Sequence, residues 1–363
     1  MKIPAWPCWI LSSYELELAR ALSSLPGGAL EFRLPIWGAI LFYLLISLPL
    51  LPSHLPSSSK RPFAEAFFKM RKAKLPKIPA LWLSGGLAVA AVLLWIAAAS
   101  MPDGRLHVWF LDVGEGDAVL IQSPCKHYIL IDGGPSPEKV LKELGKRMPF
   151  WRRDLDLVIL THPHEDHLAG LLGVLERYEV RRVLARSPPD FDSPLLRKWE
   201  EMLQEKGVER IEAVEGQEID LGRGAKMRVL NPPPILLEGT SSDVDNNGIV
   251  LRLSWGEVSF LFAADIYADG EEDLLRRGEV LRSTVLKVPH HGSISSSTRS
   301  FLEAVNPKIA VISAGEDNPF GHPDPPVVRR LEEYVGERLY LTSRDGTVEC
   351  ITDGRRLWVR TER

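Results

Sequence analysis

Three histidines and an aspartate stand within six residues, in the segment His162-Pro163-His164-Glu165-Asp166-His167. The chain has nine histidines, and six of them lie in this segment, in the pair His290-His291 or at His322. Imidazole and carboxylate ligands together suit Zn²⁺, Mn²⁺ or Fe²⁺. The three cysteines of the chain include no CxxC pair, which excludes a zinc ribbon. The residue types therefore predict a metal centre built from histidines and carboxylates.

The spacing within this segment can serve two metal ions. His162 and His164 alternate along a loop and can face one ion, whereas Asp166 and His167 start a predicted helix and can face a second. Asp265, which ends another predicted strand, is the natural carboxylate to bridge the two ions. We therefore assign His162, His164 and Asp265 to one ion, and Asp166, His167, His291 and the shared Asp265 to the other, with His290 as the alternative to His291.

Further residues are predicted to serve the reaction. Asp132 precedes Gly133-Gly134, where it either orients a ligand histidine or forms a turn. His290 is predicted to protonate a leaving group or to contact phosphate, and Asp166 counts as catalytic as well as a ligand. His322 is either a turn residue or a substrate contact, and Lys287 and Lys308 are weaker candidates for phosphate contacts.

Short β-rich runs bounded by Gly, Asp and Pro begin at residue 106. The predicted strands are 106–113, 118–124, 127–134, 156–161, 181–185, a hairpin over 246–265, 283–289, 308–315, 338–342, 347–352 and 357–361. The predicted helices are 137–146, 168–178, 195–207 and 325–335. This interleaving predicts a layered α/β fold. The candidate ligands follow strand ends, where loops at the same end of a sheet can converge on one site.

The first hundred residues differ chemically from the rest. They carry ten of the 44 Lys and Arg and four of the 48 Asp and Glu, so their net charge is +6 and that of the remainder is −10. Two charge-free apolar runs, 34–51 and 79–99, are near the length that a membrane-spanning helix needs. We predict two transmembrane helices within 34–100, with buried core helices as the alternative.

The loop at 53–78 between these runs is rich in Lys and Arg and contains one acidic residue, which predicts a cytoplasmic position. The alternative is a basic nucleic-acid or lipid-headgroup patch in a soluble protein. Residues 1–33 are predicted to form an amphipathic interfacial segment. Residues 101–363 are then predicted to form a globular domain on the extracytoplasmic face of the cell membrane.

The segment HPHEDH resembles the HxHxDH signature of the metallo-β-lactamase superfamily, which implies an αββα sandwich and a site for one or two metal ions. More closely, FLDVGEGDA, LIDGG, THPHEDHLAG, NNGIVLRL, FAAD, KVPHHGS and SAGEDNPFGHP resemble, in order, the extracellular domain of the ComEC family of DNA-uptake channels. Glu115 stands where that pattern has Gln, Gly248 where it has Ser, and Ala264 where it has Gly. The third histidine of the first metal site has no counterpart, and Asn247 lies near its position.

The resemblance implies a membrane-anchored, metal-dependent nuclease that degrades the non-transported strand during DNA uptake, with two divalent ions, Mn or Zn, as cofactors. Its implied partners are single-stranded DNA, the membrane, the rest of an uptake channel and its DNA receptor. One alternative is a hydrolase of another substrate, such as a phosphodiester headgroup, a lactam or a thioester. Another is a non-catalytic module of an uptake complex. The charge of −10 opposes DNA binding unless local basic residues contact the phosphates.

Overall fold

The computed structural model describes residues 103–186, 191–316 and 318–363, together with Gly86 and Val89–Ala91, which are helical. The predicted interfacial segment 1–33, the basic loop 53–78 and the rest of both predicted transmembrane helices lie outside the described residues. Among the helices that the structure describes, none has the length and apolar character needed to cross a bilayer.

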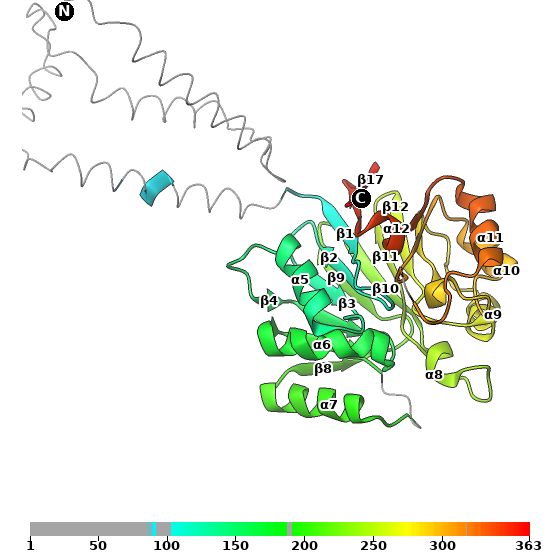
Figure 1. Cartoon of the computed structure of the whole chain (residues 1–363), viewed down its shortest axis with the longest axis horizontal. Coiled ribbons are helices and arrows are strands. Elements are labelled where there is room, and N and C mark those ends of the chain that lie inside the picture. Colours follow the sequence, from blue (N-terminus) through cyan, green and yellow to red (C-terminus); the bar gives the residue numbers. More distant parts are fainter. Residues whose placement is uncertain (1–85, 87–88, 92–102, 187–190, 317) are drawn as a thin grey trace, which may run out of the picture. The chain divides into compact units, whose positions relative to one another are not determined.

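Two mixed sheets form the centre of the described domain (Figure 1). The eight-stranded sheet consists, in spatial order, of β17 (Leu357–Thr361), β16 (Val348–Thr352), β1 (Leu106–Phe110), β2 (Val119–Gln122), β3 (Tyr128–Ile131), β5 (Leu157–Leu160), β7 (Arg182–Ala185) and β8 (Glu209–Glu212). The seven-stranded sheet consists of β15 (Leu339–Leu341), β14 (Ile309–Ile312), β13 (Val285–Lys287), β12 (Val258–Phe262), β11 (Val250–Trp255), β10 (Ala225–Asn231) and β9 (Glu218–Gly222). A small separate pair joins β4 (Asp154–Leu155) and β6 (Glu179–Val180).

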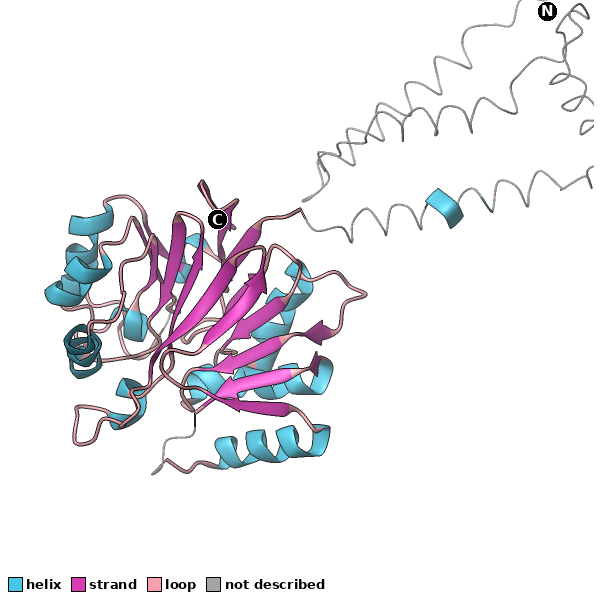
Figure 2. Ribbon diagram, turned by 180° about the vertical axis from the view of Figure 1, so that it is seen from behind, coloured by secondary structure: helices cyan, strands magenta, loops and turns pink. Residues whose placement is uncertain are grey.

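Helices cover the outer face of each sheet, so that the layers run helix, sheet, sheet, helix (Figure 2). The eight-stranded sheet packs against α5 (Pro137–Arg147), α6 (Glu165–Arg177) and α7 (Pro194–Lys206). The seven-stranded sheet packs against α9 (Ala268–Arg277), α10 (Arg299–Val305) and α11 (Pro325–Val335). The remaining short helices are α8 (Asp243–Asn246), the 3₁₀ turn η2 (Pro289–Gly292) and α12 (Thr342–Asp345).

Alternation along the strands builds three apolar layers. In β5, Leu157 and Ile159 face the other sheet, while Val158 and Leu160 face the helices. Because successive strand residues point to opposite faces, one strand can serve two cores only if every residue is apolar. This requirement explains why the central strands are continuous apolar runs. The order of the layers confirms the predicted αββα sandwich.

Most predicted elements are present, but the sequence pattern missed several. The strands β8, β9 and β10 and the helices α8, α9 and α10 were not predicted. β8 reads ERIE and is largely exposed, and α9 is strongly charged with a glycine in its first turn, so neither shows a clear apolar period. Their position depends on contacts with distant strands rather than on local pattern.

Candidate metal centre

Four segments that follow strand ends carry the predicted site residues. In one sheet, β3 leads to Asp132 and its parallel neighbour β5 leads to His162 and His164. In the other sheet, β12 leads to Asp265 and its parallel neighbour β13 leads to η2. Ends of adjacent parallel strands meet at one edge of a sheet, which is why these segments converge.

The backbone at these strand ends is unusual. Asp132, Ala264, His290 and His291 have φ angles of 56°, 47°, 48° and 51°. Few non-glycine residues adopt this left-handed region, and such residues concentrate at functional sites. Ala264 occupies the position where the ComEC pattern has glycine, a residue that adopts this backbone without steric cost. These sharp turns direct the site side chains into the space between the strand ends.

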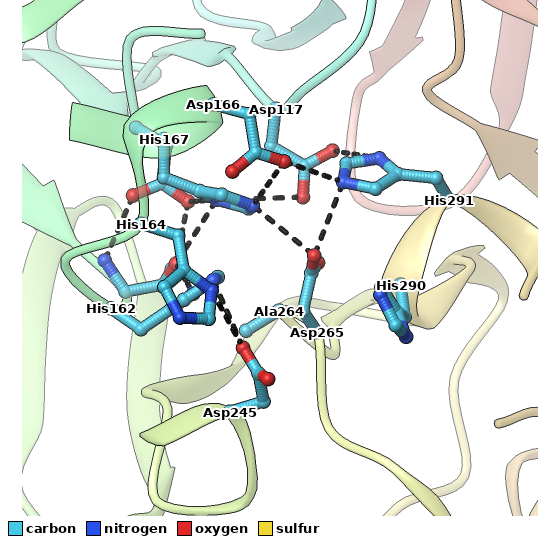
Figure 3. A network of polar contacts seen from close by, with 12 residues as sticks. Asp117, His162, His164, Asp166, His167, Asp245, Ala264, Asp265, His290 and His291 are labelled. Atoms are coloured by element: carbon cyan, nitrogen blue, oxygen red, sulfur yellow. Dashed lines mark hydrogen bonds and ion pairs between the residues drawn. The ribbon is translucent and has the colours of Figure 1, made fainter. Parts of the chain in front are cut away.

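Asp166, His167, Asp265 and His291 form a group of possible metal ligands, which we call the aspartate-rich cluster (Figure 3). Asp265 Oδ2 lies 3.2 Å from His167 Nε2 and 3.1 Å from His291 Nε2. Asp166 Oδ2 lies 3.2 Å from His291 Nε2 and 3.6 Å from His167 Nε2. Ligands about 2.0–2.2 Å from a tetrahedral ion are about 3.3–3.6 Å apart, so this spacing fits one ion.

Hydrogen bonds hold both histidines of this cluster in the tautomer that a metal needs. His167 Nδ1 donates to Asp132 Oδ2 over 2.9 Å, and His291 Nδ1 donates to the carbonyl of Ser313 over 2.9 Å. In both rings Nε2 is left facing Asp265. Thr161 donates its backbone N–H and its hydroxyl to Asp132, at 2.8 and 2.6 Å. Asp132 is thus placed to orient a ligand histidine.

His162, His164 and Asp245 form the second group, which we call the histidine-rich cluster. Asp245 Oδ1 lies 3.3 Å from His162 Nε2 and 3.1 Å from His164 Nδ1. The Thr161 hydroxyl gives its one proton to Asp132, so it accepts from His162 Nδ1 at 3.1 Å. His162 Nε2 is then buried, has no hydrogen-bond partner in the described structure and fits a metal ligand.

The two clusters adjoin, because the rings of His162 and His167 are 4.0 Å apart between centroids. Burial and the neighbouring His167 lower the pKa of His162 to about 3, so its imidazole is neutral at pH 7. Burial disfavours charge on His167 and His291, but Asp265 and the other nearby carboxylates raise the pKa of both well above its usual value. The nearby carboxylates thus favour positive charge at this cluster. A metal ion that binds here must displace the protons on Nε2 of these histidines.

Lys287 and Asp117 add a buried ion pair behind the aspartate-rich cluster. The Lys287 side chain is 2% exposed, and its ammonium contacts Asp117, Asp265 Oδ1 at 3.2 Å and the Ala264 carbonyl at 2.9 Å. The prediction that Lys287 contacts phosphate is wrong, because the ammonium is enclosed by these partners. Burial opposes ionisation of Asp265, but His291, His167 and Lys287 hold its pKa well below the usual value.

The structure groups the predicted ligands differently from the sequence assignment. Asp265 lies with Asp166, His167 and His291, while Asp245 stands beside His162 and His164. Asp245 was missed because it directly precedes the motif NNGIVLRL, and nothing in the sequence distinguishes it from the neighbouring Asp243. Asn247 does not join the histidines: its side chain bonds to the backbone of Leu237 and Asp243.

The structure separates the two adjacent histidines of η2. His291 lies in the aspartate-rich cluster, whereas the His290 ring stacks on Tyr267 and its Nδ1 lies 2.8 Å from the Ser295 hydroxyl. Figure 3 shows His290 apart from the network of polar contacts. The ring of His322 lies 5.7 Å from that of His290.

Imidazole and carboxylate clusters at the strand ends of an αββα sandwich define a metal-dependent hydrolase. The sequence pattern described as the metallo-beta-lactamase superfamily matches residues 111–316, and the chain belongs to this superfamily. It is 28% identical over 287 residues to ComE operon protein 3 of Bacillus subtilis (strain 168), covering 74% of this chain and 36% of that protein. It is 29% identical over 272 residues to Competence protein ComA of Neisseria gonorrhoeae, covering 73% of this chain and 36% of that protein.

These homologues confirm the predicted resemblance to the ComEC family. The chain spans 36% of the length of each of these two relatives. Among solved structures, Tm1679, a metal-dependent hydrolase of the beta-lactamase superfamily, is 16% identical with a TM-score of 0.43, over 68% of this chain and 97% of that chain.

Proposed function

We propose that the protein is a membrane-anchored nuclease that hydrolyses phosphodiester bonds of DNA with two divalent ions, Mn or Zn. The observation that carries this proposal is the pair of adjoining ligand clusters, whose neighbouring members His162 and His167 are 4.0 Å apart between ring centroids. Paired ions clamp the attacking and leaving oxygens of a phosphodiester and lower the pKa of a bound water. His162, His164 and Asp245 would hold one ion, and Asp166, His167, Asp265 and His291 the other.

The chain's own residues supply orientation and proton handling. Asp132 keeps Nδ1 of His167 protonated, so that Nε2 stays available as a ligand. His290 is partly buried and outside both clusters, and burial lowers its pKa, so its imidazole is neutral at pH 7. A neutral imidazole can accept a proton from the attacking side or relay one to the leaving oxygen. We assign that role to His290.

The relatives support DNA as the substrate and the membrane as the location. Two of them are named as proteins of competence or of the ComE operon. The apolar runs 34–51 and 79–99 and the basic loop between them support two transmembrane helices with the hydrolase domain outside. Single-stranded DNA, the rest of an uptake channel and its DNA receptor are the proposed partners.

A nuclease assay on the full chain in detergent micelles tests this function. Labelled single-stranded DNA and bis(4-nitrophenyl) phosphate are incubated with the protein in Mn²⁺ or Zn²⁺. We expect metal-dependent cleavage of DNA, and a loss of at least about 100-fold in kcat for Asp166→Ala and His164→Ala. Cleavage of the small diester with DNA untouched would favour another hydrolase. No bound metal and no cleavage of either substrate would favour a non-catalytic module.

A further inference from the structure

A row of four aromatic rings leads away from the aspartate-rich cluster, and we call it the ring row. Tyr267 and His290 are stacked, with centroids 4.6 Å apart and planes at 18°. His290 meets the edge of His322 at 5.7 Å, and His322 stacks on Phe320 at 6.1 Å with planes at 14°. The four rings come from the start of α9, from η2 and from the loop after β14. None of them is a ligand in either cluster.

Exposure increases along this row from the metal centre outward. His291, which lies in the aspartate-rich cluster, is 3% exposed, and its ring is 6.2 Å from that of His290. His290 and His322 are partly exposed, and Phe320 is 70% exposed. An aromatic ring that only filled the core would be buried, because burial is what makes its apolar surface stabilising. Phe320 is instead exposed to solvent, and it lies two rings along the row from His290, the neighbour of His291.

The loop that carries Phe320 is fixed by hydrogen bonds. Asn318 donates to the carbonyls of Gly315 and His322, at 3.0 and 2.6 Å, and accepts from the His322 N–H at 2.9 Å. Asp324 ties the same loop to η2, because its N–H donates to the Gly292 carbonyl over 3.0 Å. The exposed ring is therefore held in place beside the histidine pair, which lowers the entropy lost when a ligand stacks on it.

We propose that Phe320, supported by His322 and His290, stacks on a nucleobase next to the scissile phosphate, which makes the site selective for single-stranded DNA. This inference rests on the proposed nuclease function. Aromatic rings bind the bases of single strands without sequence preference, because every base has a π face. Bases in a duplex are already stacked and paired, so they cannot use the ring row unless the strand is opened.

The test compares two oligomers that have the same backbone and the same charge. One is a 5′-labelled oligothymidylate of twenty nucleotides, and the other carries an abasic tetrahydrofuran residue at every position. The full chain in detergent micelles is assayed with both in Mn²⁺. The variants are Phe320→Ala, which removes the ring, and Phe320→Trp, which keeps one. Phe150→Ala is the matched control, because Phe150 is 76% exposed and lies outside the ring row.

We expect Phe320→Ala to raise KM for oligothymidylate by roughly 5- to 150-fold, which corresponds to the free energy of one base–aromatic stack, and to leave cleavage of the abasic oligomer unchanged. Phe320→Trp and Phe150→Ala should match the wild type. An equal effect of Phe320→Ala on both oligomers would show that the ring only supports the loop, and no effect on either would show that no base stacks on it. Both results overturn the inference while the nuclease function stands.

A wild-type protein that cleaves neither oligomer overturns the nuclease proposal, and the inference fails with it. Duplex DNA of the same length provides the second readout. We expect wild-type protein to cleave the single strand faster than the duplex, and Phe320→Ala to reduce that preference. A preference that is unchanged in Phe320→Ala would assign strand selectivity to another part of the protein.

Discussion

At the scale of single residues, Asp245 changes the chemistry of the histidine-rich cluster. A carboxylate oxygen stands beside His162 and His164 where many relatives in the superfamily would place a third imidazole. Carboxylate ligands suit Mn²⁺ better than imidazoles do. The negative charge of the carboxylate also balances part of the positive charge of a divalent ion. The ligand set of this cluster is therefore harder than three histidines would be.

Replacing Asp245 tests whether the carboxylate is a ligand. We expect Asp245→Ala to remove one of two bound Mn²⁺ ions, or to weaken its binding at least 10-fold, because two imidazoles alone hold this metal poorly. Asp245→His should shift the preference of the cluster toward Zn²⁺. Metal content after dialysis against buffered Mn²⁺ or Zn²⁺ measures both effects. Glu238→Ala is the control, since Glu238 is exposed in the loop that precedes α8. An unchanged metal content in Asp245→Ala would exclude the carboxylate as a ligand.

Lys287 neutralises carboxylates that the fold has buried together. Its ammonium contacts Asp117 and Asp265, whose side chains are each 4% exposed. Burial lowers the pKa of Lys287, but the two carboxylates more than compensate and raise it above its usual value. Removing one partner of a buried ion pair leaves an uncompensated charge, which is strongly destabilising.

We expect Lys287→Met to lower the free energy of unfolding by about 3–5 kcal/mol in EDTA. The loss should be smaller in Mn²⁺, because an ion at the aspartate-rich cluster supplies positive charge to Asp265. Urea unfolding with and without metal measures the difference. The double variant Asp117→Asn/Lys287→Met should recover part of the loss, since it removes one of the two carboxylates. Equal losses with and without metal would contradict a link between Lys287 and the metal centre.

At the scale of elements, the sequence predicts the strands that end at the site but not how the clusters are composed. The apolar runs mark β3, β5, β12 and β13, and the segment HPHEDH, at the end of β5 and the start of α6, marks four of the seven residues of the two clusters. Asp245 lies on the four-residue helix α8, and it reaches His162 only because Asn231 and Asn246 fasten that helix to β10 and α9. Such long-range contacts leave no local pattern.

The ambiguity between His290 and His291 has the same cause. The two residues are adjacent histidines with similar left-handed backbone angles, so neither residue type nor local backbone distinguishes the ligand. His291 faces the cluster because Nδ1 finds the Ser313 carbonyl at the end of β14, a strand more than twenty residues away along the chain. Only the parallel pairing of β13 with β14 brings that carbonyl within reach.

A buried carboxylate fastens the loop that positions His290. Glu271, on α9, accepts hydrogen bonds from the backbone N–H groups of Ser297 and Thr298, at 2.5 and 2.8 Å. Ser295 in the same loop contacts His290 Nδ1. Burial raises the pKa of Glu271 to about 7, against the opposing effect of these bonds. The helix α9 thus controls the loop through an ionisable group.

This pKa makes stability depend on pH in a defined direction. The pKa of Glu271 is higher in the folded state than in the unfolded state, so the protonated carboxyl stabilises the fold. This contribution to the free energy of unfolding is complete below about pH 4.5. It is lost as the pH rises through about 7, and the loss is up to about 3 kcal/mol. We expect Glu271→Gln to abolish this dependence. The variant should also be less stable at pH 5 by about 1–3 kcal/mol, because its amide leaves one backbone N–H without an acceptor.

Urea unfolding of Glu271→Gln at pH 5, 6, 7 and 8 in saturating Mn²⁺ provides the measurement. The difference from wild type should shrink as pH rises. Glu272→Gln is the control, because Glu272 is the exposed neighbour on the same helix. A difference that stays constant from pH 5 to pH 8 would show that Glu271 does not titrate in this range.

At the scale of the whole molecule, a net charge of −10 on residues 101–363 opposes the approach of DNA. Lys139 and Lys142 on α5 line a cavity of about 540 Å³, where their positive charges can attract phosphates despite the net negative charge. Neither lysine forms an ion pair with another described residue, whereas the lining carboxylates of Asp112 and Glu143 pair with basic side chains. Glu115 and Glu316 also line the cavity, and burial raises the pKa of Glu115.

The cavity adjoins the aspartate-rich cluster, because the segment from Gly114 to Asp117 runs from its lining to the Asp166 carbonyl, which Asp117 N–H contacts at 3.2 Å. If DNA phosphates occupy it, each lysine contact releases counterions and steepens the salt dependence of binding by about 0.7 per phosphate on a single strand. We therefore expect Lys139→Gln/Lys142→Gln to reduce the slope of log K against log salt by about 1.4. Affinity at low salt should fall while metal content stays at the wild-type value.

Fluorescence anisotropy of a labelled oligothymidylate, with Ca²⁺ in place of Mn²⁺ to prevent cleavage, measures the slope between 50 and 300 mM salt, a range of about sixfold. The matched control is Lys198→Gln/Lys206→Gln, which removes the same charge from exposed positions on α7, outside the cavity lining. Equal slopes for the two double variants would show that net charge alone governs DNA binding. A reduced slope in the α5 variant alone would place phosphates of the bound strand in the cavity, beside Lys139 and Lys142.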